Sequence, residues 1–328
     1  MKKLISSIIS LLKLKKEKKG ITVVSLFDGM SCAMIALDEL GIKVDKYIAF
    51  EIESNPIKVS SHNNPDIIHM GDVKQINYEE ILKICGGKVD LLIGGSPCQD
   101  LSIAKSNRQG LDGARSGLFW NYVEAKERLN PKYFVLENVA SMSQDNKNRI
   151  SEAMGVDFIN INSEKLSAQK RNRLYWTNIP NVKQPEVQEI YLKDIIEDGY
   201  TDKNKSYCID ANYFKGSNYE MYIKKSKRQI IFEKQSIPST AVKEGQEVWI
   251  KKYVEGNVFM SKAEGTKLTD PIKFNDKGFR KLTVLECERL QCVPDGYTNV
   301  EGVSNTERYK MIGNGFTVSV IKHILSEM

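Results

Sequence analysis

The chain has 328 residues, of which 41% are hydrophobic and 27% are charged, a composition typical of a globular protein and unlike that of a disordered or fibrous one. Its formal net charge of +6 arises in residues 1–20, which hold seven lysines and one glutamate, so the remaining chain is formally neutral. The overall charge therefore gives no support for nucleic-acid binding, and any phosphate-binding surface must be local.

The basic tail, residues 1–20, places a short apolar stretch between lysines. It lacks the small-residue cleavage site of a secretory signal peptide, and the apolar stretch is too short to span a bilayer. We expect a frayed basic amphipathic helix, or residues translated from an upstream start codon, rather than a membrane contact.

The cysteines and histidines are scattered and do not indicate a metal site. The six cysteines are Cys32, Cys85, Cys98, Cys208, Cys287 and Cys292, and none belongs to a C-x-x-C pair. The three histidines form no ligand cluster with them, so we expect no bound zinc. Unpaired thiols of this kind are typical of a reducing compartment, and we expect a cytoplasmic protein.

From residue 21 to residue 180, strand-like and helix-like apolar patterns alternate. Strands are predicted at 21–27, 44–52, 66–73, 89–95 and 133–139, and helices at 32–41, 55–63, 78–87 and 116–130. This rhythm predicts an α/β fold, a doubly wound sheet with helices on both faces.

After residue 180 the pattern changes to a stretch rich in lysine, glutamate, asparagine and tyrosine. Only short strand-like pieces are visible, at 229–232 and 247–254. Amphipathic helices return at 282–293 and 317–328. We therefore predict four parts: a tail at 1–20, a main domain at 21–180, a smaller and mostly irregular or β module at 181–279, and a segment at 280–328 that returns to the main domain.

The ends of the first three strands carry side chains suited to an adenosyl ligand. Glu51 lies 22 residues after Gly29, an offset that suits an acid binding the two hydroxyls of a ribose. Asp72 could accept from an adenine amino group, and Phe27 could lie against the adenine ring. No G-x-G-x-x-G pyrophosphate cradle accompanies them. The set favours S-adenosylmethionine, although each acid alone could be an exposed loop residue.

The fourth strand leads into "GGSPCQDLS", residues 94–102, which places Cys98 on a stiff loop after a proline. A cysteine there is either a nucleophile or a small buried core residue. The fifth strand ends in "LENV" with Glu137, which could instead cap a helix. In "AQKRNRLYW" the alternation of Gln169, Arg171 and Arg173 predicts one strand face, unless these arginines face solvent.

These motifs, in this order, resemble the DNA cytosine-5-methyltransferase family over residues 21–180 and 280–328. The motifs "SLFDGMS" and "GGSPCQD" are most similar to those of the branch that contains the vertebrate de novo enzymes and related bacterial and phage proteins. The resemblance implies a catalytic domain that binds S-adenosylmethionine, with S-adenosylhomocysteine as product, and a target-recognition domain at 181–279.

The resemblance also implies the chemistry. Cys98 would add to C6 of a cytosine flipped out of duplex DNA, Glu137 would contact N3 and the exocyclic amine, and Arg171 would hold the base oxygen. The stretch 99–117 would form a lid over the DNA. The implied cofactor-binding residues are Phe27, Asp28, Gly29, Met30, Ser31, Glu51, Asp72, Val73, Pro97, Asn314, Gly315 and Phe316. The implied DNA-binding residues are Gln99, Ser102, Arg108, Arg115, Arg173, Lys224, Lys225, Lys227 and Arg228.

The sequence departs from the family pattern at three positions. Ser25 replaces an aspartate common in bacterial members, and Ser31 and Ala33 stand where a glycine is usual. We expect a shifted cofactor contact, with binding retained. Two alternatives stay open: an RNA methyltransferase of the same fold, and an idle relative that only binds DNA. We expect duplex DNA as partner and a bacterial or phage origin, and we leave open a cognate restriction endonuclease.

Overall fold

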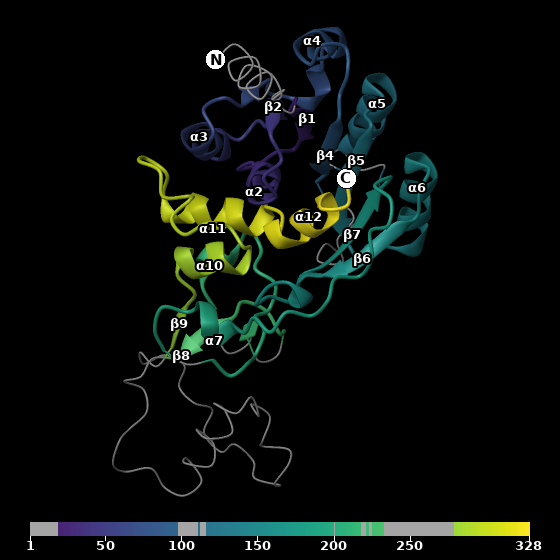
Figure 1. Cartoon of the computed structure of the whole chain (residues 1–328). Coiled ribbons are helices and arrows are strands. Elements are labelled where there is room, and N and C mark those ends of the chain that lie inside the picture. The colour runs from purple at the N-terminus through teal and green to yellow at the C-terminus, as the bar shows by residue number, and fades with distance from the viewer. Residues whose placement is uncertain are drawn as a thin grey trace, which may run out of the picture.

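The computed structural model describes residues 19–97, 111, 116–199, 201–217, 221–222, 225–232 and 279–328. Its centre is a seven-stranded sheet with the order β3-β2-β1-β4-β5-β7-β6 (Figure 1). The strands are β1 (Ile21–Leu26), β2 (Val44–Phe50), β3 (Ile68–His69), β4 (Leu91–Gly95), β5 (Tyr133–Val139), β6 (Phe158–Asn162) and β7 (Asn172–Thr177). Strands β1 to β5 pair in parallel, whereas β7 runs antiparallel to both β5 and β6.

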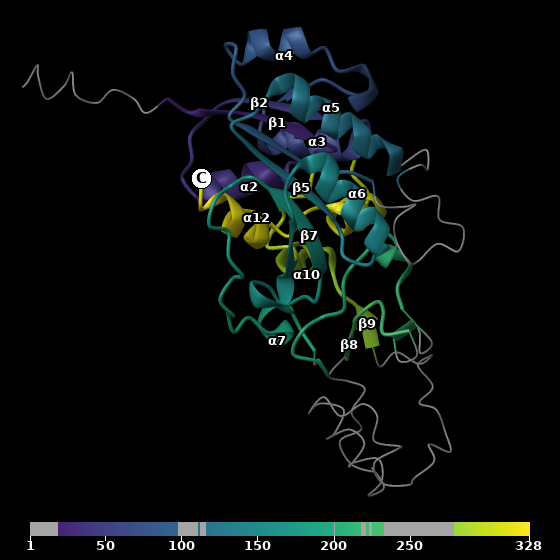
Figure 2. The ribbon, with the colours of Figure 1, turned by 90° about the vertical axis from the view of Figure 1, so that its right-hand side faces the viewer.

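Helices cover both faces of this sheet, as the alternating pattern predicts (Figure 2). One face packs against α2 (Cys32–Glu39), α3 (Ser54–Asn63) and α12 (Val318–Leu325), and the other against α4 (Tyr78–Ile84), α5 (Phe119–Leu129) and α6 (Gln144–Met154). Consecutive strand residues point to opposite faces, so Val23 joins the first core cluster and Val24 the second. The doubly wound prediction is confirmed.

The register of the parallel strands places their carboxyl ends at one edge. Leu26 pairs with Phe50 on one side and with Gly94 on the other, and Gly95 pairs with Glu137. The loops that follow these strands therefore leave the sheet side by side. Ligands bind at this edge in open α/β sheets.

Several elements differ from the prediction. The strand expected at 66–73 is reduced to β3, because Asp72 caps the short 3₁₀ helix η1 (Val73–Gln75) through Lys74. Helix α6 and strand β6 were not predicted, since 144–154 is mostly polar and buries few apolar side chains. The tail before residue 19 and the strand expected at 247–254 lie outside the described residues.

Residues beyond β7 are irregular where the structure describes them. They include α7 (Leu192–Ile195), the 3₁₀ helix η5 (Tyr213–Lys215) and the antiparallel pair of β8 (Ile230–Phe232) and β9 (Phe279–Lys281). Helices α10 (Val284–Leu290) and α11 (Asn305–Asn314) then lead back to α12. Leu192, Ile209 and Tyr213 share the core cluster of the first sheet face, so the described part of 181–217 packs directly on the seven-stranded sheet.

Helices α2 and α12 lie side by side in both views (Figures 1 and 2). Lys322 of α12 reaches Glu39 of α2 at 2.9 Å, and Ile321, Ile324 and Leu325 are buried. None of the helices that the structure describes is both long and apolar enough to cross a lipid bilayer.

Candidate active site

The turn after β1 has an unusual backbone. Phe27, Gly29 and Ser31 all have φ near +60°, a left-handed conformation that non-glycine residues rarely adopt. The turn is anchored by the Asp28 N–H, which donates to the Phe50 carbonyl of β2 at 3.0 Å. Met30 and Ser31 are fully buried, so they support the turn from inside.

Glu51 ties this first strand end to the second. Its carboxylate accepts from the backbone N–H of Gly29 at 2.9 Å, of Ile52 at 2.7 Å and of Glu53 at 2.9 Å. An ionised carboxylate has about four acceptor positions, so capacity remains for a further donor. Next to it the Ile52 side chain is 70% exposed, an unusual position for a large apolar group. The Glu51 side chain is thus fixed at this edge of the sheet by backbone hydrogen bonds.

The third strand end lies on the same edge. Asp72 accepts from the Lys74 N–H at 3.0 Å, and the carbonyl of the buried Val73 accepts from the Asn121 amide of α5 at 3.4 Å. The loop is therefore held to α5, close to where the chain returns after residue 115. Sequence reasoning missed Ile52 and Asn121, although an apolar residue directly after Glu51 was a visible signal.

Two glycines allow the close packing of the fourth strand end. A Cβ on Gly94 would lie 2.6 Å from the Leu26 carbonyl. A Cβ on Gly95 would lie 2.9 Å from the Phe316 ring and 3.1 Å from Glu137 Oε2. The carboxylate of Glu137 and the ring of Phe316 thus both pack closely against the backbone of Gly95, which leads into the loop that contains Cys98.

The start of that loop is fixed by Asn138. Its buried amide donates to the carbonyl of Ser96 at 3.2 Å and to the Ser96 hydroxyl at 3.1 Å. Pro97 follows, half-buried. The remaining residues expected on this loop and its lid, Cys98, Gln99, Ser102, Arg108 and Arg115, lie outside the described residues.

Glu137 faces Arg173 across the sheet. Arg173 Nε lies 2.8 Å from Glu137 Oε1, and the two side chains are 16% and 13% exposed. Val139 pairs with Arg173 and Glu137 with Tyr175, so the ion pair joins diagonal neighbours on adjacent antiparallel strands. This places a cation at the carboxyl group predicted to be catalytic.

Arg171 does not lie on strand β7 beside Arg173. The prediction that Gln169, Arg171 and Arg173 share one face of a strand is therefore wrong. Strand β7 begins only at Asn172, so Gln169 and Arg171 precede it. The Arg171 guanidinium is buried and donates to the carbonyls of Ile209 at 3.2 Å, Gly313 at 3.1 Å and Gly315 at 2.9 Å. Both terminal nitrogens bond backbone carbonyls, whereas Nε is buried without a hydrogen-bond partner, and Arg171 thereby crosslinks the loop at 209 to the end of α11.

The end of α11 is packed too tightly for any side chain at Gly313. An added Cβ would come within 2.3 Å of the Asp210 backbone. Gly315 is also confined, by Cys32 at 3.1 Å and Met30 at 3.2 Å, which brings it against the turn after β1. Between these glycines Asn314 is exposed.

Burial affects the titrating groups. Among the described thiols, burial raises the pKa of Cys32, Cys85, Cys287 and Cys292, which disfavours their nucleophilic thiolate forms. Burial also raises the pKa of Asp28 from 3.8 to about 6. No group of three or more His, Cys, Asp or Glu side chains in the described ranges is arranged to hold a metal ion.

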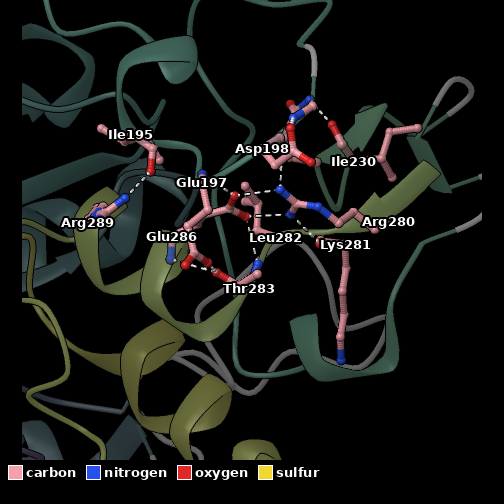
Figure 3. Close-up of polar contacts among 12 residues, drawn as sticks. Ile195, Glu197, Asp198, Ile230, Arg280, Lys281, Leu282, Thr283, Glu286 and Arg289 are labelled. Atoms are coloured by element: carbon pink, nitrogen blue, oxygen red, sulfur yellow. Dashed lines mark hydrogen bonds and ion pairs between the residues drawn. The ribbon is translucent and has the colours of Figure 1, made fainter. Parts of the chain in front are cut away.

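The joint between the irregular module and α10 is a buried ion pair (Figure 3). Arg280 donates to both oxygens of Glu286, at 2.7 Å and 2.8 Å, and Glu286 also accepts from the N–H groups of Glu197 and Thr283, both at 2.8 Å. Thr283 caps α10 through the Glu286 N–H. The T-x-x-E capping box in "LTVLECERL" was the sequence signal for this joint.

The basic cluster 224–228 is partly described. Lys225 and Lys227 are exposed, whereas Arg228 donates to the Gly216 carbonyl at 3.0 Å. Lys224 lies outside the described residues. Arg228 is therefore engaged within the module, which leaves the lysines as its more accessible cations.

The strand order, with β7 antiparallel between β5 and β6, and the ligand-facing strand ends define an α/β methyltransferase of the S-adenosylmethionine-dependent class. A family model described as "C-5 cytosine-specific DNA methylase" matches residues 21–328. The chain belongs to this family, as the resemblance of its motifs indicated.

Known relatives include restriction-system and phage enzymes. The type II methyltransferase M.HpaII of Haemophilus parainfluenzae is 28% identical, over 93% of this chain and 88% of its own. The orphan methyltransferase M.SPRI of Bacillus phage SPR is 32% identical over 192 residues, which are 54% of this chain and 42% of that protein. The chain thus spans less than half the length of this phage relative.

Solved structures agree on the fold. The Entamoeba histolytica methyltransferase EhMeth has a TM-score of 0.67 at 15% identity, over 94% of this chain and 98% of its own. A Spodoptera frugiperda DNMT2 mutant has a TM-score of 0.62 at 18% identity, over 94% and 99%. At these identities the likeness concerns the fold alone.

Proposed function

We propose that the protein is a DNA cytosine-5-methyltransferase that uses S-adenosylmethionine. The observation that carries the proposal is the Arg173–Glu137 ion pair, held against Gly95 at the start of the loop that contains Cys98. A carboxyl group, a guanidinium and a cysteine loop at one sheet edge provide an acid, a charge-stabilising cation and a nucleophile.

The first strand ends fit an adenosyl ligand. A Cβ on Gly29 would meet no heavy atom within 4 Å, so space is open beside the turn. We assign Glu51 to the ribose hydroxyls, Asp72 to the adenine amino group, and Phe27 and Ile52 to apolar contacts with the base. When bound, S-adenosylmethionine supplies a methyl group carried on a positively charged sulfur.

The chain's own groups would activate the cytosine. C5 is a poor nucleophile until C6 is attacked, and the Cys98 thiolate would make that bond. Glu137 would hydrogen-bond N3 and the exocyclic amine and take part in protonating N3. We assign the base oxygen to Arg173 in place of Arg171, because Arg171 is occupied by three carbonyls. Once C5 carries the transferred methyl group, loss of the C5 proton to a water molecule would break the C6–sulfur bond and release the Cys98 thiolate.

Duplex DNA is the proposed substrate, with the cytosine flipped out of the stack. We assign the residues 181–279 to target recognition, and Lys224, Lys225 and Lys227 to phosphate contacts. Gln99, Ser102, Arg108 and Arg115 are assigned to the lid over the flipped base. The three lysines would strengthen binding to DNA of any sequence, because phosphate contacts carry no sequence information. Polar and aromatic side chains of the module would recognise the target sequence.

The experiment that tests the proposal is methyl transfer from S-adenosylmethionine with a labelled methyl group, compared between duplex DNA and tRNA, with the product nucleoside identified by mass spectrometry. We expect 5-methylcytosine in DNA. Methylation of tRNA instead would establish the RNA alternative. Folded protein that binds S-adenosylhomocysteine but methylates neither would establish the idle relative.

A further inference from the structure

A chain of buried side chains runs beneath the turn after β1. Tyr47 of β2 donates to Asp28 Oδ1 at 2.7 Å, and the Ser31 hydroxyl donates to Asp28 Oδ2. Ser31 Oγ lies 2.6 Å from Ser60 Oγ of α3, and Ser60 Oγ lies 3.2 Å from Nε2 of His69 at the end of β3. The chain therefore joins the turn to three neighbouring elements.

The number of protons available determines which group donates in each of these hydrogen bonds. A hydroxyl has one proton, and an ionised carboxylate has none to give. Ser31 donates to ionised Asp28, so it must accept from Ser60, and Ser60 must accept in turn from His69 Nε2–H. His69 is then the neutral tautomer with a bare Nδ1. That atom is buried without a hydrogen-bond partner, and a bare acceptor there is better tolerated than an orphaned N–H donor.

The chain holds a strained residue in place. Ser31 has φ of 63° and is the N-cap residue of α2, although its side chain makes no capping bond to that helix. A glycine would adopt this conformation without a steric penalty. Serine is retained here with its hydroxyl fixed on both sides by Asp28 and Ser60. The hydroxyl thus offsets the strain that its own Cβ introduces.

We propose that Asp28, Ser31, Ser60 and His69 form a directional hydrogen-bond relay that holds the turn 27–31 in the shape that accepts the cofactor. Asp28 is then a positioning residue whose carboxylate faces away from the ligand, which replaces its earlier assignment as a cofactor contact. The inference rests on the proposed function, because it takes the space beside Gly29 as the cofactor site.

The relay depends on the charge of Asp28. The groups that face Asp28 are the hydroxyls of Ser25, Ser31 and Tyr47, and the more distant Glu51, Cys32 and Tyr297. Burial, and to a smaller extent the negative charge of Glu51, raises the pKa of Asp28. At pH 8 the carboxylate is ionised and the relay runs from His69 toward it. A proton on Asp28 Oδ2 would let Asp28 donate to Ser31, while Tyr47 still donates to Asp28 Oδ1. The bonds of Ser31 to Ser60 and of Ser60 to His69 would then reverse, and His69 would carry an orphaned N–H at Nδ1.

The first test is the tautomer of His69, measured by ¹⁵N NMR in the full chain at pH 8. The chain has only three histidines, so the signals can be assigned by substitution. We expect the Nε2–H tautomer in the wild type and a loss of this preference in Ser60→Ala. The control is Ser163→Ala, which removes another buried hydroxyl, one that bonds the Gln169 carbonyl. A wild-type Nδ1–H tautomer, or no change in Ser60→Ala, would overturn the relay.

The second test is affinity for S-adenosylhomocysteine, measured by calorimetry together with the thermal unfolding midpoint. We expect Tyr47→Phe and Ser31→Ala to weaken binding about tenfold while remaining folded. Tyr309→Phe, which also loses a buried hydroxyl bond, to the Leu282 carbonyl, should bind like the wild type. Unchanged affinity in both relay variants would overturn the positioning role. Failure of the wild type to bind would instead reject the proposed function, and the tautomer would still test the relay.

Discussion

The guanidinium of Arg173 contacts the carboxylate of Glu137 at 2.8 Å, and both side chains are largely shielded from solvent. The contact is set by the antiparallel pairing of β5 with β7, which differs from the parallel pairing among β1 to β5. The antiparallel strand thus brings a cation to the same edge as the parallel strand ends. This geometry distinguishes the two arginines of the "QKRNR" motif.

Substitution of these two arginines should affect different properties most strongly, methyl transfer for Arg173 and stability for Arg171. Arg173→Ala should lower methyl transfer by at least about a hundredfold, because it removes a charge-stabilising group near the base. Arg171→Ala should instead lower the free energy of unfolding by about 3 kcal/mol, because three buried carbonyls lose a charged donor. Turnover and denaturant unfolding of both variants check this. Equal losses of activity with equal stability would show that the roles are not divided.

Cys98→Ala should abolish methyl transfer while binding of S-adenosylhomocysteine is nearly retained. Loss of a covalent nucleophile costs several kcal/mol of transition-state stabilisation, and the cofactor contacts lie on other strand ends. Wild-type protein should also form a covalent adduct with DNA that carries 5-fluorocytosine at the target, and the variant should not. A variant that keeps a tenth of wild-type turnover would disprove the assignment.

Glu51→Ala should raise the dissociation constant for S-adenosylmethionine by roughly ten- to a hundredfold, with turnover at saturation retained. The reason is twofold, since the change removes a ribose acceptor and releases the Gly29 N–H. Asp72→Ala should act in the same direction. Calorimetry with both variants is the measurement, and unchanged affinity in both would remove them from the site.

Glu286→Ala should destabilise the joint between the irregular module and α10 by about 3–5 kcal/mol, because it leaves Arg280 half-buried without its carboxylate. The exposed pair of Arg289 and Asp295 offers a matched control. Asp295→Ala should cost at most about 1 kcal/mol. Denaturant unfolding measures both, and similar losses would show that the buried pair has no special role.

The stability of the protein should also depend on Asp28 in acid. Its pKa is 3.8 when unfolded and about 6 when folded, so the folded chain binds more protons between these values. The stability contributed by protonated Asp28 is present below pH 3.8 and is lost as the pH rises through 6, up to about 3 kcal/mol. The free energy of unfolding of Asp28→Asn, relative to wild type, should therefore rise from pH 4 to pH 7. A difference that stays constant with pH would contradict the burial of an ionised carboxylate.

The parallel strands could be predicted from sequence because buried strands appear as continuous apolar runs, such as "VDLLI" at 89–93. Helix α6 could not, since its buried side chains are few and separated by polar ones. A clearer signal was Ser143, which caps it, with Gly155 at its end.

The position of Glu51, Asp72 and Glu137 at strand ends could be predicted, because these residues directly follow or end the apolar runs, whereas their roles stay predictions. The division of roles between Arg171 and Arg173 was not predicted, since alternation assumes a regular strand and β7 begins between them. The direction of Asp28 was also hidden. Its side-chain partners, Tyr47 and Ser31, reach it only through the contact of β1 with β2 and the left-handed turn at Ser31.

The packing of α12 against α2 has a consequence for synthesis. A ribosome completes residues 32–39 early, and the sheet of residues 21–177 emerges long before residues 318–325. Until then, the apolar face that α2 presents to α12 has no cover, and the Gly315 end of the cofactor turn is missing. The nascent chain is therefore expected to hold a nearly complete sheet with an exposed apolar strip on α2 until α12 has been synthesised.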